Sequence, residues 1–231
     1  MENEKSVLRW GGLAGILAFI VWIIEMPLYG FVDPFTPEGL MRFTDVRAAL
    51  GMSTILMMTI AFLSVALVLA LYRALRGNNL KFALYGSVLG VTGYIVTALG
   101  DASTFFAFTP ISTLIQAPET TPETQATAVL LWQTTQGLTS TFFFVGSLFM
   151  TICFIVLGLA MLRAPAFGRR FGVVSIILGL IGVVGVVASL FIPGDTGMQI
   201  MGIAVFANLI FLPLFGWKAY TLSREPRSPR T

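Results

Sequence analysis

The segment from Ala48 to Lys81, AALGMSTILMMTIAFLSVALVLALYRALRGNNLK, decides the fold class of this chain. Its first part, from Ala48 to Tyr72, carries no charge and is long enough to cross the roughly 30 Å hydrocarbon layer of a bilayer as an α-helix. The bases Arg73 and Arg76 follow directly, and Lys81 ends the connection. Because backbone polar groups in lipid must be hydrogen-bonded within the segment, this pattern indicates a membrane-spanning helix and then a turn at the membrane surface.

Five further apolar runs have the same character, and none of them alternates apolar and polar residues as a barrel strand would. The composition agrees, since 56% of the 231 residues are hydrophobic and 11% are charged, against roughly 25% charged in a soluble domain. The sequence therefore predicts an all-α integral membrane bundle, with a single transmembrane domain over residues 1–231. Its six predicted transmembrane helices lie at about residues 10–29, 48–72, 82–106, 138–162, 171–192 and 200–220.

The uncharged stretch from Thr124 to Leu162 is longer than one membrane crossing requires. Thr121, Pro122 and Glu123 just before it have the pattern of an N-cap, a first-turn proline and a first-turn acid. We therefore expect a helix that begins at this point and projects from the outer face for several turns before it enters the membrane.

Acidic and basic residues are sorted into alternate connections. The first, third and fifth connections and their flanks hold eight of the eleven acids, which are Glu25, Asp33, Glu38, Asp45, Asp101, Glu119, Glu123 and Asp195. The other side holds twelve of the fourteen bases, which are Lys5, Arg9, Arg73, Arg76, Lys81, Arg163, Arg169, Arg170, Lys218, Arg224, Arg227 and Arg230. Because short loops rich in Lys and Arg stay cytoplasmic, the sequence predicts that both termini are cytoplasmic.

The same sorting explains the net charge of +3 without a nucleic-acid partner. The bases lie at helix ends on one side, including a short basic tail at residues 223–231, so they indicate contact with the lipid bilayer rather than a binding patch. Another membrane protein or a second copy of the chain is also a possible partner. Gly86 and Gly90, four residues apart, could mark such a dimer face, although packing inside one copy is the commoner role of this spacing.

Two acids reach the outer part of the predicted bundle. Glu25 is about 24 Å beyond Arg9 along its helix, and Asp101 is about 30 Å beyond Lys81, so both approach the same membrane face. Ionisable groups near lipid are costly and often functional, which suggests a shallow outward-facing pocket for a cation or a small polar ligand. The alternative is a local salt bridge to an outer base, Arg42 or Arg47. The remaining candidates for this ligand site are Arg47, Gln133 and Gln136.

Asn208 is a further candidate binding residue because it lies about 15 Å before Lys218, near the bilayer centre. Pro213 in the same run frees a backbone carbonyl, and together they could line a path for a solute. The alternative is that Asn208 hydrogen-bonds a neighbouring helix.

Catalysis has little support in the sequence. There is no histidine, Cys153 is the single cysteine, and the chain contains neither G-x-S-x-G nor H-E-x-x-H. We therefore expect no catalytic residue, no metal site and no cofactor.

Two segments carry a resemblance to a known family. The first is Leu69–Arg73 with Asn79–Leu84, and the second is Gly158–Arg163 with Phe167, Gly168 and Gly179. In these positions the chain resembles a family of bacterial multi-spanning proteins catalogued as domain of unknown function 4386. The resemblance implies a bacterial plasma membrane, and it implies no catalytic residue because that family has no assigned chemistry.

These observations together predict a non-enzymatic integral membrane protein of the bacterial plasma membrane, either a subunit or a ligand-responsive module. The alternative is a small transporter or carrier of an apolar or weakly polar compound. Polar residues at mid-depth are too few for a water-filled path, which disfavours an ion channel.

Overall fold

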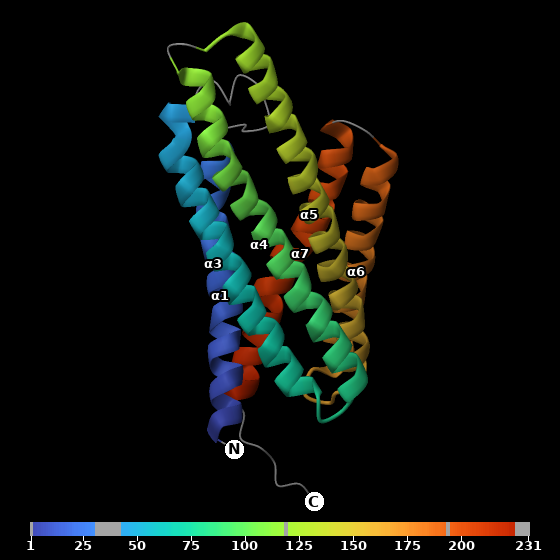
Figure 1. Ribbon diagram of the computed structural model, residues 1–231. Helices are drawn as coiled ribbons and strands as arrows, with labels where there is room; N and C mark the ends of the chain where they lie inside the picture. The colour runs from blue at the N-terminus through green and yellow to red at the C-terminus, as the bar shows by residue number, and fades with distance from the viewer. Residues whose placement is uncertain (1, 31–42, 118–119, 193–194, 225–231) are drawn as a thin grey trace, which may run out of the picture.

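The computed structural model describes residues 2–30, 43–117, 120–192 and 195–224, and these residues form a bundle of long α-helices (Figure 1). The helices are α1 (Glu2–Gly30), α3 (Phe43–Leu75), α4 (Leu80–Gln116), α5 (Pro122–Leu162), α6 (Gly168–Phe191) and α7 (Asp195–Arg224). Six helices of the described part are long and apolar enough to cross a membrane, and no described residue is in a strand. The predicted all-α fold with six spans is confirmed; the cytoplasmic placement of the termini stays a prediction.

Each helix packs against its neighbours along the chain, and α7 returns to pack against α1. The helices therefore form a closed ring, in which the first turns of α1 lie beside the last turns of α7 (Figure 1). We call this end the terminal end of the bundle. The turns between α3 and α4 and between α5 and α6 also lie there, as the predicted topology requires.

Glycines allow the helices to approach closely at the terminal end. A methyl group built on Gly12 of α1 would lie 2.5 Å from the backbone nitrogen of Tyr220 and 2.7 Å from the carbonyl oxygen of Gly216, both on α7. Gly86 on α4 meets Leu157 of α5, and Gly90 meets Cys153. Gly86 and Gly90 thus pack inside one copy of the chain, the second of the two roles considered for them.

An aromatic plug fills the centre of the ring at the terminal half. It consists of Phe154 on α5 with Phe211 and Phe215 on α7, all of them fully buried. The rings of Phe154 and Phe211 stack with centroids 3.9 Å apart, and those of Phe211 and Phe215 are 4.3 Å apart. Leu67 and Leu71 of α3 are equally buried in the same core, so this half of the bundle is solidly packed.

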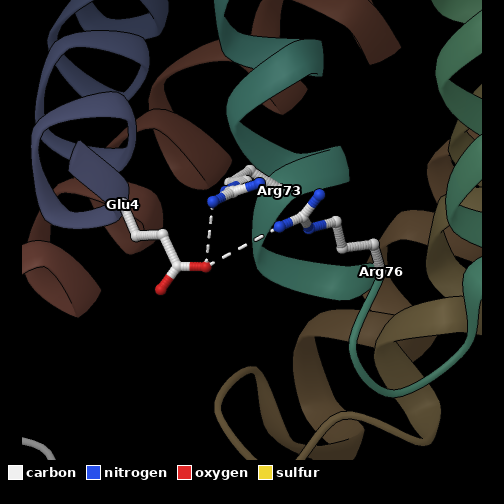
Figure 2. A network of polar contacts seen from close by, with 3 residues as sticks. All are labelled: Glu4, Arg73 and Arg76. Atoms are coloured by element: carbon white, nitrogen blue, oxygen red, sulfur yellow. Dashed lines mark ion pairs between the residues drawn. The ribbon is translucent and has the colours of Figure 1, made fainter. Parts of the chain in front are cut away.

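An ion-pair cluster joins the first turn of α1 to the end of α3 (Figure 2). Glu4 Oε1 lies 3.2 Å from an Nη2 of Arg73 and 3.9 Å from that of Arg76, which follows α3 directly. All three side chains are partly exposed, so each pair contributes at most about 1 kcal/mol. The cluster places the Glu4 carboxylate beside the bases Arg73 and Arg76 at the terminal end.

Helices α4 and α5 continue well beyond the predicted spans. With a rise of about 1.5 Å per residue, α5 is about 60 Å long, whereas a bilayer with its headgroups is about 40–45 Å thick. The helix begins at Pro122 with the Thr121 hydroxyl accepting the Thr124 backbone N–H, so the predicted N-cap is confirmed.

The α4–α5 extension has a small core of its own, made by Phe108, Ile111, Ile115, Ala128 and Trp132. The rings of Phe108 and Trp132 have centroids 4.7 Å apart. The sequence predicted the projection of α5, but it did not predict that α4 extends with it.

Candidate functional site

A cavity of about 470 Å³ lies in the half of the bundle away from the termini. Side chains of α1, α3, α4, α5 and α7 line it, whereas α6 packs outside on α5 and α7. The lining residues are Trp22, Glu25, Met26, Met57, Ile60, Ala61, Tyr94, Thr97, Ala98, Asp101, Phe143, Ser147, Met150, Thr151, Ala204, Val205 and Asn208.

The order of residues along each helix places the aromatic plug directly beneath this cavity. On α7, Asn208 lines the cavity and Phe211 belongs to the plug one turn nearer the terminal end. On α5, Thr151 lines the cavity and Phe154 belongs to the plug, again one turn nearer the terminal end. The cavity therefore ends at about mid-depth and has a packed apolar floor between it and the terminal end.

A polar pair crosses the bottom of the cavity from α4 to α7. The Tyr94 hydroxyl donates to Asn208 Oδ1 at 2.6 Å, and both side chains are at least 95% buried. Asn208 thus hydrogen-bonds a neighbouring helix, as one of its two predicted roles required, and it also lines the cavity.

Two carboxyl groups line the part of the cavity farther from the termini. Glu25 on α1 is 2% exposed, and its Oε1 accepts the hydroxyl of Ser53 on α3 at 2.6 Å. Asp101 on α4 lies two turns beyond Tyr94 on the same helix and is partly buried. Across the described parts of the chain, neither carboxyl group forms an ion pair with a Lys or Arg side chain.

The walls between these polar groups are apolar and adaptable. Met26, Met57 and Met150 contribute flexible thioether chains, which fit ligands of irregular shape. The hydroxyls of Thr97 and Thr151 donate to backbone carbonyls of their own helices, at 3.0 Å and 2.9 Å, so they add little free polarity. The cavity suits a ligand that is mostly apolar and has few polar atoms.

The structure brings together three of the six candidate residues, Glu25, Asp101 and Asn208. Arg47 and Gln133 are exposed and do not line the cavity. Arg42, the other base considered as a salt-bridge partner, lies outside the described residues.

Gln136 is half-buried at the extension, but both polar atoms of its side-chain amide are buried and find no hydrogen-bond partner among the described residues. The indole nitrogen of Trp132, one turn away, is also buried and has no hydrogen-bond partner within residues 2–30, 43–117, 120–192 and 195–224. Gln136 therefore does not contribute to the cavity described above.

Sequence reasoning did not find Trp22, Ser53 and Tyr94. A depth calculation offers one signal, because Tyr94 is about 20 Å from Lys81 and so lies near the level of Asn208. The depth of a residue along its helix does not show which helices pack against each other. Within the described residues no group of three His, Cys, Asp or Glu side chains could hold a metal ion.

Comparisons with protein families, with curated proteins and with solved structures find no match to this chain. The resemblance to domain of unknown function 4386 therefore stays a prediction. The fold and the cavity define the class of protein, a multi-pass helical membrane protein with a mostly apolar cavity between its helices.

Proposed function

We propose that this chain is a non-enzymatic, ligand-responsive protein of the bacterial plasma membrane that holds a small, largely apolar molecule in the cavity. The observation that carries the proposal is the cavity itself, with a volume of about 470 Å³ lined by side chains of five helices. A space of this size lies within the range of small-molecule binding sites, which are mostly apolar and have a few polar groups.

Ligand binding can change the shape of the bundle because the two halves differ in packing. The terminal half is held by glycine contacts and the aromatic plug, whereas α1, α3, α4, α5 and α7 surround a space in the other half. A ligand that contacts all five helices favours one arrangement of them, and a partner protein could detect that arrangement.

The experiment uses cysteine reactivity in proteoliposomes. Ser147 lines the cavity on α5, and the native Cys153 lies six residues further along the same helix with no exposed surface. We expect Ser147→Cys, combined with Cys153→Ser, to react with methyl methanethiosulfonate at least about tenfold faster than native Cys153, since position 147 lines the cavity whereas Cys153 has no exposed surface and does not line it.

Biphenyl serves as the apolar probe. It should slow the reaction of Ser147→Cys in a saturable manner, and it should leave Leu99→Cys unaffected, because Leu99 on α4 is 53% exposed and does not line the cavity. The proposal fails if Ser147→Cys is as inert as Cys153, or if biphenyl slows both engineered cysteines equally.

A carrier of an apolar or weakly polar compound is the second candidate. The position of the cavity favours this function. The cavity ends at the Tyr94–Asn208 pair near mid-depth, and the aromatic plug blocks it below. This shape is expected of one state of an alternating-access carrier. The purified chain alone would then move a probe across proteoliposomes. A ligand-responsive module would instead bind the probe without moving it, and would co-purify with a partner after mild solubilisation.

A further inference from the structure

We infer that the natural occupant of the cavity carries one positive charge on an apolar, aromatic-sized body, and that Glu25 and Asp101 recognise this charge. The inference rests on the proposed ligand-binding function and adds the chemical class of the ligand. It starts from the two carboxyl groups, because a charge buried in a protein is normally paired or neutralised.

Glu25 lacks a charged partner in the described structure. Glu25 is 2% exposed, and its Oε1 accepts a hydrogen bond from the Ser53 hydroxyl. A carboxylate has about four acceptor positions, so one hydrogen bond leaves most of its capacity free. The Ser53 contact also holds the Glu25 carboxyl group at the cavity wall.

Asp101 brings a second acid to the same cavity from a different helix. Among the described residues that line the cavity there are two acids and no Lys or Arg. Two carboxylates in a region of low dielectric repel each other and each loses hydration, which is costly. A ligand that brings a positive charge into the cavity offsets part of both penalties, whereas an anionic ligand increases them.

The remaining lining argues for an organic cation rather than a metal ion. Calcium and magnesium ions take about six or more oxygen ligands, and the cavity walls are mainly methyl, methylene and aromatic groups. Trp22, Tyr94 and Phe143 supply aromatic rings, which attract alkylammonium groups through their π faces. Apolar walls and two carboxylates together fit a hydrophobic ammonium compound.

The test uses two probes of the same shape that differ in charge. The cation 4-biphenyltrimethylammonium and the neutral 4-tert-butylbiphenyl are compared by their protection of Ser147→Cys in proteoliposomes, in the Cys153→Ser background. The two probes partition differently into lipid, so each probe is compared between proteins and not with the other probe.

Neutralising either carboxyl group should weaken binding of the cation and leave binding of the neutral probe nearly unchanged. We expect Glu25→Gln and Asp101→Asn each to raise the concentration of cation needed for half-protection at least about tenfold, because each removes one partner of a desolvated charge pair. Protection by the neutral probe should change by less than about twofold, which also shows that the variants are folded. Glu123→Gln is the control, since Glu123 is exposed at the start of α5 and does not line the cavity.

The outcomes separate this inference from the proposed function. If biphenyl and both larger probes fail to protect Ser147→Cys, the ligand-binding function itself is wrong. If the neutral probe protects but neutralising Glu25 and Asp101 leaves protection by the cation unchanged, the function stands and the assigned ligand class is wrong.

Discussion

At the scale of single residues, buried polar groups differ in whether the fold satisfies them. Tyr94 and Asn208 satisfy each other across α4 and α7, whereas both polar atoms of the Gln136 amide are buried and have no partner in the described part of the chain. A buried polar group without a hydrogen bond costs about 1–3 kcal/mol, so these two sites should respond oppositely to apolar substitution.

Gln136→Leu should stabilise the protein. The substitution removes the unsatisfied donor and acceptor, and we expect a gain of about 1 kcal/mol or more in the free energy of unfolding in detergent. Gln133→Leu, three residues earlier on the same helix and exposed, is the matched control and should change stability by less than about 0.5 kcal/mol. Loss of stability in Gln136→Leu would mean that the amide has a partner in the membrane.

The Tyr94–Asn208 hydrogen bond should show a small favourable coupling. A double-mutant cycle with Tyr94→Phe and Asn208→Leu is expected to give about 0.6 kcal/mol, the mean for hydrogen bonds between helices in membranes. The measurement is unfolding of the four proteins in the same detergent mixture. Strictly additive effects of the two substitutions would show that the hydrogen bond contributes nothing to stability.

At the scale of the helices, close approach depends on a few glycines rather than on the apolar surface as a whole. In lipid the apolar faces of helices gain little by associating, so van der Waals contact at small residues selects the neighbours. Gly12 of α1 faces the backbone of α7, and Gly146 of α5 faces that of α4 at Gly93. At Gly202, in the interior of α7, no described atom beyond the adjacent residues and the local helix backbone lies within 4 Å of the Cβ position.

Gly12→Ala and Gly202→Ala should therefore have opposite effects. The added methyl at Gly12 would overlap backbone atoms of Tyr220 and Gly216 that cannot rotate away, so α1 and α7 must separate at a cost of about 1–3 kcal/mol. At Gly202 the methyl meets open space and reduces backbone freedom in the unfolded chain, so stability should be unchanged or slightly higher. Unfolding of both variants in detergent measures the difference; equal destabilisation would contradict the packing argument.

At the scale of the whole molecule, the bundle has a packed terminal half, a half that encloses the cavity, and an extension of α4 and α5. The extension has its own contacts, centred on Phe108 and Trp132, and its helices exceed the thickness of a bilayer. If the charge sorting sets the orientation, this extension lies outside the cell and the turn between α5 and α6 lies inside.

Two single cysteines test that orientation. In a Cys153→Ser background, Gln133→Cys reports on the extension and Ala166→Cys on the α5–α6 turn; both native side chains are exposed. A membrane-impermeant maleimide should label Gln133→Cys in spheroplasts, and it should label Ala166→Cys only after permeabilisation. The reverse result would place the termini outside, in conflict with the distribution of Lys and Arg.

The sequence by itself determined the six helices, the start of α5 at Pro122 and the candidates Glu25, Asp101 and Asn208. Hydropathy, capping and depth are local properties, since each depends on residues close together in the chain. Only the tertiary structure decided that these three candidates share one cavity with Trp22 and Tyr94, that Ser53 hydrogen-bonds Glu25 at its wall, and that Gln136 does not line it. The reason is physical: the neighbours and rotation of a helix in lipid follow from contacts between small residues on distant segments, such as Gly12 with Gly216.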